Sequence, residues 1–200
     1  MRNARQRGIH PVDRKNHIRS NMNLTLIGYR ATGKTTLARL LAERLGWDWI
    51  DADVEIERVA GKTIARIFAE DGEPVFRDIE AGVIAELAAR PNLVIAAGGG
   101  APLREASRLA MREHGRVVWL LASPETIHAR MIGDATTTSR RPNLTDRGPL
   151  DEIMHLLSAR EPAYREAAHL AVDTEGKPPE ALVEEILGRL AMSPSGGAGA

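Results

Sequence analysis

The chain has 200 residues, of which 43% are hydrophobic, which is enough to bury one sizeable core but not two independent domains. Its 27 basic and 27 acidic residues cancel and it has no cysteine, so nothing indicates nucleic acid or an anionic membrane, and disulfides and cysteine-bound metals are excluded. No apolar run approaches the roughly 20 residues that span a bilayer, so we expect a cytoplasmic, monomeric, single-domain protein without nucleic-acid or membrane partners.

The two ends of the chain differ from the rest. The first twenty residues carry six basic residues and one acid but no apolar segment, which predicts a disordered basic extension over residues 1–22 rather than a secretory signal. The alternative is that Met22 is the natural start. Residues 193–200 (SPSGGAGA) are typical of a flexible tail. A single domain over residues 23–192 remains.

Within this domain, short apolar runs alternate with longer amphipathic stretches, as in a parallel sheet covered by helices. The candidate strands are residues 24–28, 49–51, 93–97, 117–121 and 170–172. The candidate helices are residues 33–44, 53–60, 64–70, 74–89, 103–113, 124–131, 150–160 and 179–191. Residues 133–148 lack an apolar period, and their length predicts a mobile lid. The fold class is therefore α/β.

A phosphate-binding motif directly follows the first predicted strand. Residues 28–35 read GYRATGKT, a full match to G-x-x-x-x-G-K-[ST], and they open a predicted helix. In such a P-loop the backbone N–H groups surround the phosphates, the lysine reaches the β and γ oxygens, and the threonine hydroxyl binds Mg²⁺. A plain glycine-rich turn would need neither residue. We assign the nucleotide phosphates to Ala31, Thr32, Gly33, Lys34, Thr35 and Thr36.

Two carboxylates, Asp51 and Asp53, follow the second predicted strand. A spacing of two places both on the same side of an extended segment, at the carboxyl edge where parallel sheets gather their ligands. One carboxylate would then meet the magnesium ion and the other a substrate hydroxyl. The alternative is that Asp53 is an ordinary helix N-cap.

Two further motifs suit an anionic ligand. Arg77 and Glu80 share one face of a predicted helix, so the glutamate can orient the guanidinium toward a planar anion. A surface ion pair is the alternative and, for this motif alone, the more common case. Three successive glycines, residues 98–100, follow the third predicted strand and let a ligand approach the backbone, although a flexible turn is also possible.

Arginines near the predicted lid complete the set. Arg140 and Arg141 lie within the lid, and the helix after it ends in residues 160–164, REPAY. Arginines on a loop that folds over a triphosphate suit the charge of a transferring phosphoryl group, whereas a solvated basic loop is the alternative. The six histidines show no metal-ligand spacing and are expected at the surface or at an interface.

Taken in order, the motifs GYRATGKTT, DAD, FRDIE, GGG, RRP and REPAY resemble the shikimate kinase family over about residues 24–191. The resemblance implies a three-layer α/β/α P-loop kinase fold whose five-stranded parallel sheet has the order 2-3-1-4-5. It also implies ATP and Mg²⁺ as cofactors. The implied reaction is phosphorylation of the 3-hydroxyl of shikimate, on the route to chorismate and the aromatic amino acids.

The resemblance also implies site residues. Catalysis is assigned to Lys34, Asp53 and Arg141. The metal is assigned to Thr35 and Asp51. The substrate is assigned to Asp53, Arg77, Gly98, Gly99, Gly100 and Arg160. In this assignment Arg77 and Arg160 hold the substrate carboxylate, Glu80 positions Arg77, and Arg141 is the lid arginine near the phosphates.

The chain departs from the family pattern at two places. Ala31 stands where the family often has glycine, so the P-loop is built there either without a positive φ or with some strain. The family commonly places an arginine at the start of the lid against adenine, where residues 133–135 here read GDA. Arg130 and Lys177 are the candidates for the base side of the nucleotide site.

The resemblance favours direct in-line phosphoryl transfer from ATP, without a phosphoenzyme. Another small P-loop kinase, such as a gluconate kinase, would explain the P-loop but not the FRDIE, GGG and REPAY set. A noncatalytic, nucleotide-dependent regulatory protein of the same fold is the alternative from another class, because a fold alone does not fix a function.

Overall fold

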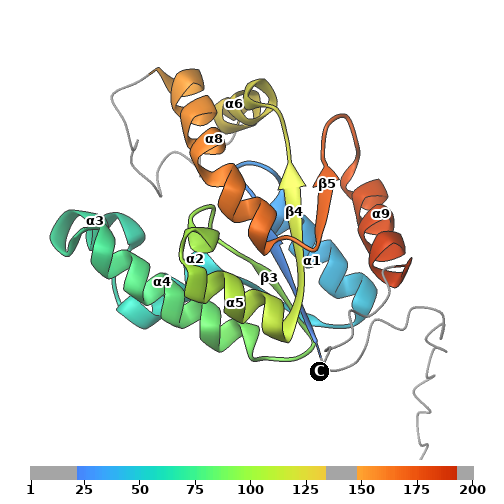
Figure 1. Ribbon diagram of the computed structural model, residues 1–200, viewed down its shortest axis with the longest axis horizontal. Helices are drawn as coiled ribbons and strands as arrows, with labels where there is room; N and C mark the ends of the chain where they lie inside the picture. Colours follow the sequence, from blue (N-terminus) through green and yellow to red (C-terminus); the bar gives the residue numbers. More distant parts are fainter. Residues whose placement is uncertain (1–21, 134–147, 193–200) are drawn as a thin grey trace, which may run out of the picture.

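The computed structural model describes residues 22–133 and 148–192 (Figure 1). The basic extension apart from Met22, the tail at 193–200 and nearly all of the predicted lid, Arg140 and Arg141 included, therefore lie outside the described residues. No helix within the described part of the chain is both long enough and apolar enough to cross a membrane.

A five-stranded parallel sheet forms the centre, in the order β2-β3-β1-β4-β5 that the family resemblance implied. The strands are β1 (Asn23–Ile27), β2 (Asp48–Asp51), β3 (Leu93–Ala96), β4 (Gly115–Leu121) and β5 (Leu170–Asp173). All five predicted strands are thus confirmed to within two residues. Strands β1 and β3 are buried along their whole length, which explains their continuous apolar runs.

The helices cover both faces of this sheet. They are α1 (Lys34–Leu45), α2 (Ala52–Ala60), α3 (Ile64–Glu70), α4 (Gly72–Ala88), α5 (Glu105–His114), α6 (Pro124–Gly133), α8 (Pro149–Ala167) and α9 (Pro179–Met192), with a 3₁₀ turn, η1 (Ala101–Leu103), before α5. In Figure 1, α4 and α5 lie on one side of the sheet and α1 and α9 on the other. The predicted three-layer α/β/α arrangement is confirmed.

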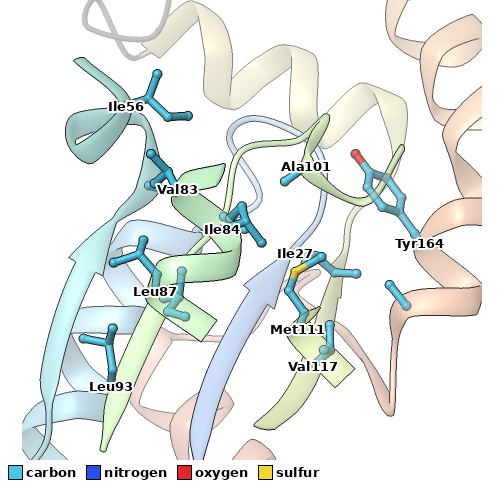
Figure 2. Close-up of a cluster of buried hydrophobic side chains, with 14 of the residues drawn as sticks. Ile27, Ile56, Val83, Ile84, Leu87, Leu93, Ala101, Met111, Val117 and Tyr164 are labelled. Carbon is cyan, nitrogen blue, oxygen red and sulfur yellow. The ribbon is translucent and has the colours of Figure 1, made fainter. Parts of the chain in front are cut away.

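Two hydrophobic clusters correspond to the two faces. On one face, Leu24 and Leu26 of β1 pack with Leu37 of α1 and Ile186 of α9. The opposite face carries the larger cluster, in which strand residues meet α2, α3, α4, α5 and α8. Figure 2 shows Ile84 and Leu87 of α4 in this cluster, and Tyr164 reaching from α8 toward the loop that carries Ala101.

The prediction that a helix ends at residue 160 is wrong, because α8 continues through Pro162 to Ala167. Proline has no backbone N–H donor, and a helix therefore usually ends near it. Here the extra turn buries Tyr164 and Ala167 completely. Arg112 of α5 also donates from Nη1 to the last carbonyls of this segment, including those of Glu166 (2.9 Å) and Ala167 (3.2 Å). Tertiary packing and this capping outweigh the local preference.

The parallel sheet brings the ends of β1, β2 and β3 to one edge. The P-loop, the two aspartates and the glycine run all follow these strands directly, so the topology places them side by side.

Just before β5, the half-buried His169 connects this strand to β4. Its Nδ1 accepts a hydrogen bond from the backbone N–H of Val117 (3.1 Å). Burial, together with the charges of Arg112 and Arg116, lowers the pKa of His169 from 6.5 to about 4. The folded protein therefore holds this ring neutral where the unfolded chain protonates it.

We predict that this histidine makes stability depend on pH. Its contribution is fully present above about pH 6.5 and is lost as the pH falls from there through about 4, because the unfolded chain binds more protons in that window. Since part of the ring is exposed, the loss between pH 7 and pH 5 should be about 1 kcal/mol in urea unfolding. Asparagine can still accept the hydrogen bond, so His169→Asn should flatten the dependence. His155→Asn, on exposed α8 surface, is the matched control. Equal pH profiles for the wild type and His169→Asn would contradict the prediction.

Candidate functional site

The P-loop between β1 and α1 is shaped by its glycines. Gly28 has φ +141°, and a Cβ there would lie 2.6 Å from the carbonyl oxygen of Leu120, so no side chain fits. Gly33 caps α1 in the left-handed conformation, with φ 92°. Ala31 also has a positive φ, 61°, which costs a non-glycine residue about 1 kcal/mol. Of the two possibilities for Ala31, the strained one is therefore observed.

Side chains of the loop fold back over its own backbone. The ammonium group of Lys34 donates to the carbonyls of Gly28 (3.0 Å) and Tyr29 (2.7 Å). The hydroxyl of Thr32 also donates to the carbonyl of Tyr29 (2.8 Å). The loop is thus held in a tight arc at the N-terminus of α1, whose first-turn N–H groups and dipole favour an anion there.

The two aspartates at the end of β2 and the start of α2 have different structural positions. Asp51 is the N-cap of α2 and accepts from the backbone N–H of Asp53 (3.0 Å), so the expectation of a shared extended segment is wrong. The N-cap alternative for Asp53 is wrong as well, because Asp51 is the N-cap and Asp53 is the second residue of the helix, within its first turn. The second oxygen of Asp51 accepts from the hydroxyl of Thr35 (2.9 Å), which joins β2 to the start of α1.

Arg77 belongs to a buried ion-pair network on α4, so the surface-pair alternative is wrong. Its Nη1 lies 2.6 Å from the carboxylate of Glu80, which is 2% exposed. Its Nη2 lies 2.9 Å from Glu73, one turn earlier. Burial alone would lower the pKa of Arg77, but the charges and hydrogen bonds of Glu80 and Glu73 outweigh it and raise this pKa above its ordinary value.

The glycine run lies directly against this guanidinium. Gly98, Gly99 and Gly100 are all buried, unlike the residues of a free surface turn. A Cβ on Gly100 would overlap Nη1 of Arg77 and lie 2.7 Å from its Cζ. A Cβ on Gly99 would lie 3.3 Å from the carbonyl oxygen of Gly28, in the P-loop. The missing side chains therefore let Arg77, the glycine run and the P-loop approach one another.

Arg160 reaches the same place from α8. It is 8% exposed, and its Nη1 donates to the carbonyl of Gly99 (3.4 Å), which also accepts from the hydroxyl of Tyr164 (2.5 Å). Glu161 does not orient it, because that carboxylate binds Arg165 (2.5 Å). Among the described residues no carboxylate forms an ion pair with Arg160. It is thus a buried cation held by the carbonyl of Gly99 and one aromatic ring, that of Tyr29.

The remaining predicted residues are placed as follows. Thr36 is exposed on the first turn of α1. Lys177 is exposed and donates to Glu185 (2.7 Å), at the loop after β5. Arg130 of α6 donates to the hydroxyl (3.1 Å) and carbonyl (3.1 Å) of Thr174 in the same loop, and to the carbonyl of Ala31 (3.4 Å). Of these two candidates for the base side, Arg130 is the one in contact with the P-loop.

Known proteins resemble this chain over most of its length. A family model described as shikimate kinase matches residues 30–191. A shikimate kinase from Rhodopirellula baltica is 47% identical over 165 residues, covering 82% of this chain and 88% of that protein. The chain belongs to the shikimate kinase family.

Solved structures agree with this family. Shikimate kinase from Acinetobacter baumannii, solved in complex with shikimate, has a TM-score of 0.79 and 38% identity, covering 86% of this chain and 93% of its own. A gluconokinase from Sinorhizobium meliloti has a TM-score of 0.53 at 18% identity, covering 86% and 95%. The second likeness shows the P-loop kinase fold alone.

Two residues that contact the site, Tyr164 and Glu73, were not singled out from the sequence. Tyr164 lay inside the REPAY motif, but only its contact with Gly99 gives it a place in the site. Glu73, four residues before Arg77, is a second carboxylate on that guanidinium, and its i,i+4 spacing was a readable signal.

We predict that Gly100→Ala destabilises the protein. The new methyl group overlaps a guanidinium that two carboxylates hold in place, so that contact or the loop must shift, at a cost of about 1–3 kcal/mol. The same substitution at Gly82, which is exposed on α4 with nothing within 4 Å, should instead stabilise by about 0.5–1 kcal/mol. Urea unfolding of both variants checks this. If both variants changed the free energy of unfolding in the same direction, Arg77 would not be packed against the glycine run.

Proposed function

We propose that this protein transfers the γ-phosphoryl group of ATP to the 3-hydroxyl of shikimate, giving shikimate 3-phosphate and ADP. The observation that carries the proposal is Arg160, a buried guanidinium without a carboxylate partner among the described residues, beside Gly99 at the edge of the P-loop. An unpaired charge is costly away from water, so this position suits an anionic ligand. The Acinetobacter baumannii neighbour, 38% identical, was solved with shikimate bound.

On the substrate side, Arg77 and Arg160 are proposed to bind the shikimate carboxylate. Both guanidiniums contact the glycine run, Arg77 at Gly100 and Arg160 at Gly99. A planar guanidinium matches both oxygens of a carboxylate, and Glu80 fixes the plane of Arg77. The ring of the substrate would then lie over the backbone of residues 98–100, where side chains are absent.

On the nucleotide side, the P-loop is proposed to hold the phosphates, with Lys34 on the β and γ oxygens. The hydroxyl of Thr35 and the carboxylate of Asp51, 2.9 Å apart, are the hard oxygen ligands that suit magnesium. When bound, the ion neutralises charge on the phosphates of ATP. Arg130 and Lys177 are the proposed base-side residues, and Arg141, outside the described residues, is the proposed lid arginine.

The proposed reaction is one in-line displacement. The 3-hydroxyl oxygen forms a bond to the γ-phosphorus while the bond from that phosphorus to the β–γ bridging oxygen breaks, and ADP leaves. Asp53, inside the first turn of α2 and positioned through the cap on Asp51, orients the hydroxyl and takes its proton. Lys34 stabilises the charge that develops on the transferring group.

An ADP-release assay tests this function. We expect ADP release that depends on shikimate and is much slower with gluconate or with no acceptor. Lys34→Ala should lower kcat by roughly 10²–10³, which assigns the activity to this P-loop. Release with gluconate alone would indicate a sugar-acid kinase. Nucleotide binding without release on any acceptor would indicate a noncatalytic protein.

A second prediction tests the carboxylate assignment. Arg77→Ala would remove an ion-pair partner of the buried Glu80 carboxylate and so affect folding as well as binding, so Arg160→Gln is the better probe. We expect kcat/KM for shikimate to fall about 10- to 100-fold, the cost of one charged hydrogen bond, with the KM for ATP within twofold. The carboxamide analogue of shikimate should be a poor substrate for the wild type and lose much less on mutation. Equal losses for acid and amide would contradict the assignment.

A further inference from the structure

Tyr29, the second residue of the P-loop, is buried in an apolar pocket that it forms with residues of two helices. The residue is 2% exposed and packs with Ile127 of α6 and Ile153 of α8, both fully buried. Neither the P-loop pattern nor the assigned reaction requires an aromatic residue here. Its position joins the phosphate-binding loop to α8, the helix that carries Arg160.

The ring of Tyr29 faces two guanidinium groups. The Cζ of Arg160 lies 5.6 Å from the ring centroid, and that of Arg30 lies at the same distance. Both fall within the range of a cation–π contact. The two arginines differ in their other partners. Arg30 forms an ion pair with the buried Glu152 (3.1 Å), whereas Arg160 has no carboxylate partner among the described residues.

The hydroxyl of Tyr29 contributes little to this arrangement. It is buried and has no hydrogen-bond partner among the described residues. A buried hydroxyl that forms no hydrogen bond costs stability, so the hydroxyl does not explain a tyrosine at this position. The part of the side chain that acts is the ring.

A ring suits a guanidinium that must bind a ligand. A carboxylate partner would neutralise Arg160 and occupy its N–H donors. An aromatic face attracts the positive charge through its quadrupole and leaves the N–H donors at the guanidinium edge unused. Within the part of the chain that the structure describes, Arg160 also donates a long hydrogen bond, 3.4 Å, to the carbonyl of Gly99.

We propose that Tyr29 is a positioning residue for substrate recognition: its ring holds the Arg160 guanidinium at the glycine run, with its N–H groups available to the substrate carboxylate. This inference rests on the proposed function, because it assigns Arg160 to that carboxylate. It adds that substrate recognition depends on a side chain of the phosphate-binding loop.

Two variants separate the effect of the aromatic ring from the effect of filling the pocket with an apolar side chain. Tyr29→Phe keeps the ring and removes the hydroxyl that lacks a partner, so its kinetic constants should stay within twofold of the wild type and its Tm should not fall. Tyr29→Leu keeps an apolar side chain in the pocket but removes the quadrupole. We expect it to raise the KM for shikimate about 3- to 30-fold, with kcat and the KM for ATP changed less than threefold.

A control variant accounts for simple loss of packing. Ile153→Val removes one methylene from the same pocket without touching the ring, so it should lower the Tm slightly and leave the KM for shikimate unchanged. A double-mutant cycle of Tyr29→Leu with Arg160→Gln should be strongly non-additive, because both changes remove the same interaction. Additive losses, or an equal rise in both KM values for Tyr29→Leu, would overturn the proposal.

A readout without substrate separates this proposal from the proposed function. In a ¹⁵N-edited spectrum of the arginine side chains, the Nε–H signal of Arg160, assigned by its absence in Arg160→Gln, should carry a ring-current shift. The shift should persist in Tyr29→Phe and vanish in Tyr29→Leu. If it is absent from the wild type, the positioning role is wrong even where shikimate is phosphorylated. If the shift is present while shikimate is not phosphorylated, the proposed function is wrong. The contact between Tyr29 and Arg160 then stands, but its assignment to recognition of the shikimate carboxylate is wrong as well.

Discussion

The guanidinium groups of Arg77 and Arg160 are buried at the carboxyl end of the sheet. The free-energy cost of burying a charge determines how the surrounding chain is built. Arg77 is compensated by carboxylates, since Glu80 and Glu73 lie 2.6 Å and 2.9 Å from its nitrogens. Arg160 is compensated by the carbonyl of Gly99 and an aromatic ring. These two ways of compensating a buried charge have different consequences. Two carboxylates fix the plane of the Arg77 guanidinium, whereas no carboxylate of the described residues neutralises the charge of Arg160.

This constraint explains why α8 must be long and continuous. Glu152, near its start, pairs with the P-loop through Arg30, and Arg160 and Tyr164 meet the glycine run two and three turns later. Residues 152 and 160 are eight positions apart, which corresponds to about 12 Å along the helix. A helix that ended at Pro162 would leave Tyr164 without a fixed position, and the hydrogen bond to the Gly99 carbonyl would be lost. The proline is therefore tolerated because the turn beyond it supports the site.

The sequence predicted the parts of the molecule that local rules determine. The strand, the P-loop pattern and the following helix lie within about twenty residues, and each of them constrains the next. The end of α8 was mispredicted, because the contact that caps it comes from Arg112, about fifty residues earlier. The burial of Arg77 was missed for a similar reason. An arginine and a glutamate three residues apart have the same spacing on a surface and in a core, and what differs is the glycine run against them.

The aspartate pair was read with the wrong geometry, yet the observed geometry gives the two carboxylates more distinct positions. Both oxygens of Asp51 are engaged, one by the backbone N–H of Asp53 and the other by the hydroxyl of Thr35. Asp51 therefore ties the start of α2 to the start of α1, while Asp53 is displaced into the first turn of α2. Within the described residues there is no group of three or more acidic or histidine side chains able to enclose a metal ion. A hydroxyl and one carboxylate would supply only part of the ligands of a magnesium ion, so water and the phosphate oxygens of the nucleotide would have to supply the rest. In the proposed reaction the ion and the nucleotide must consequently bind together, and Asp51, already fixed by two hydrogen bonds, does not have to move to meet them.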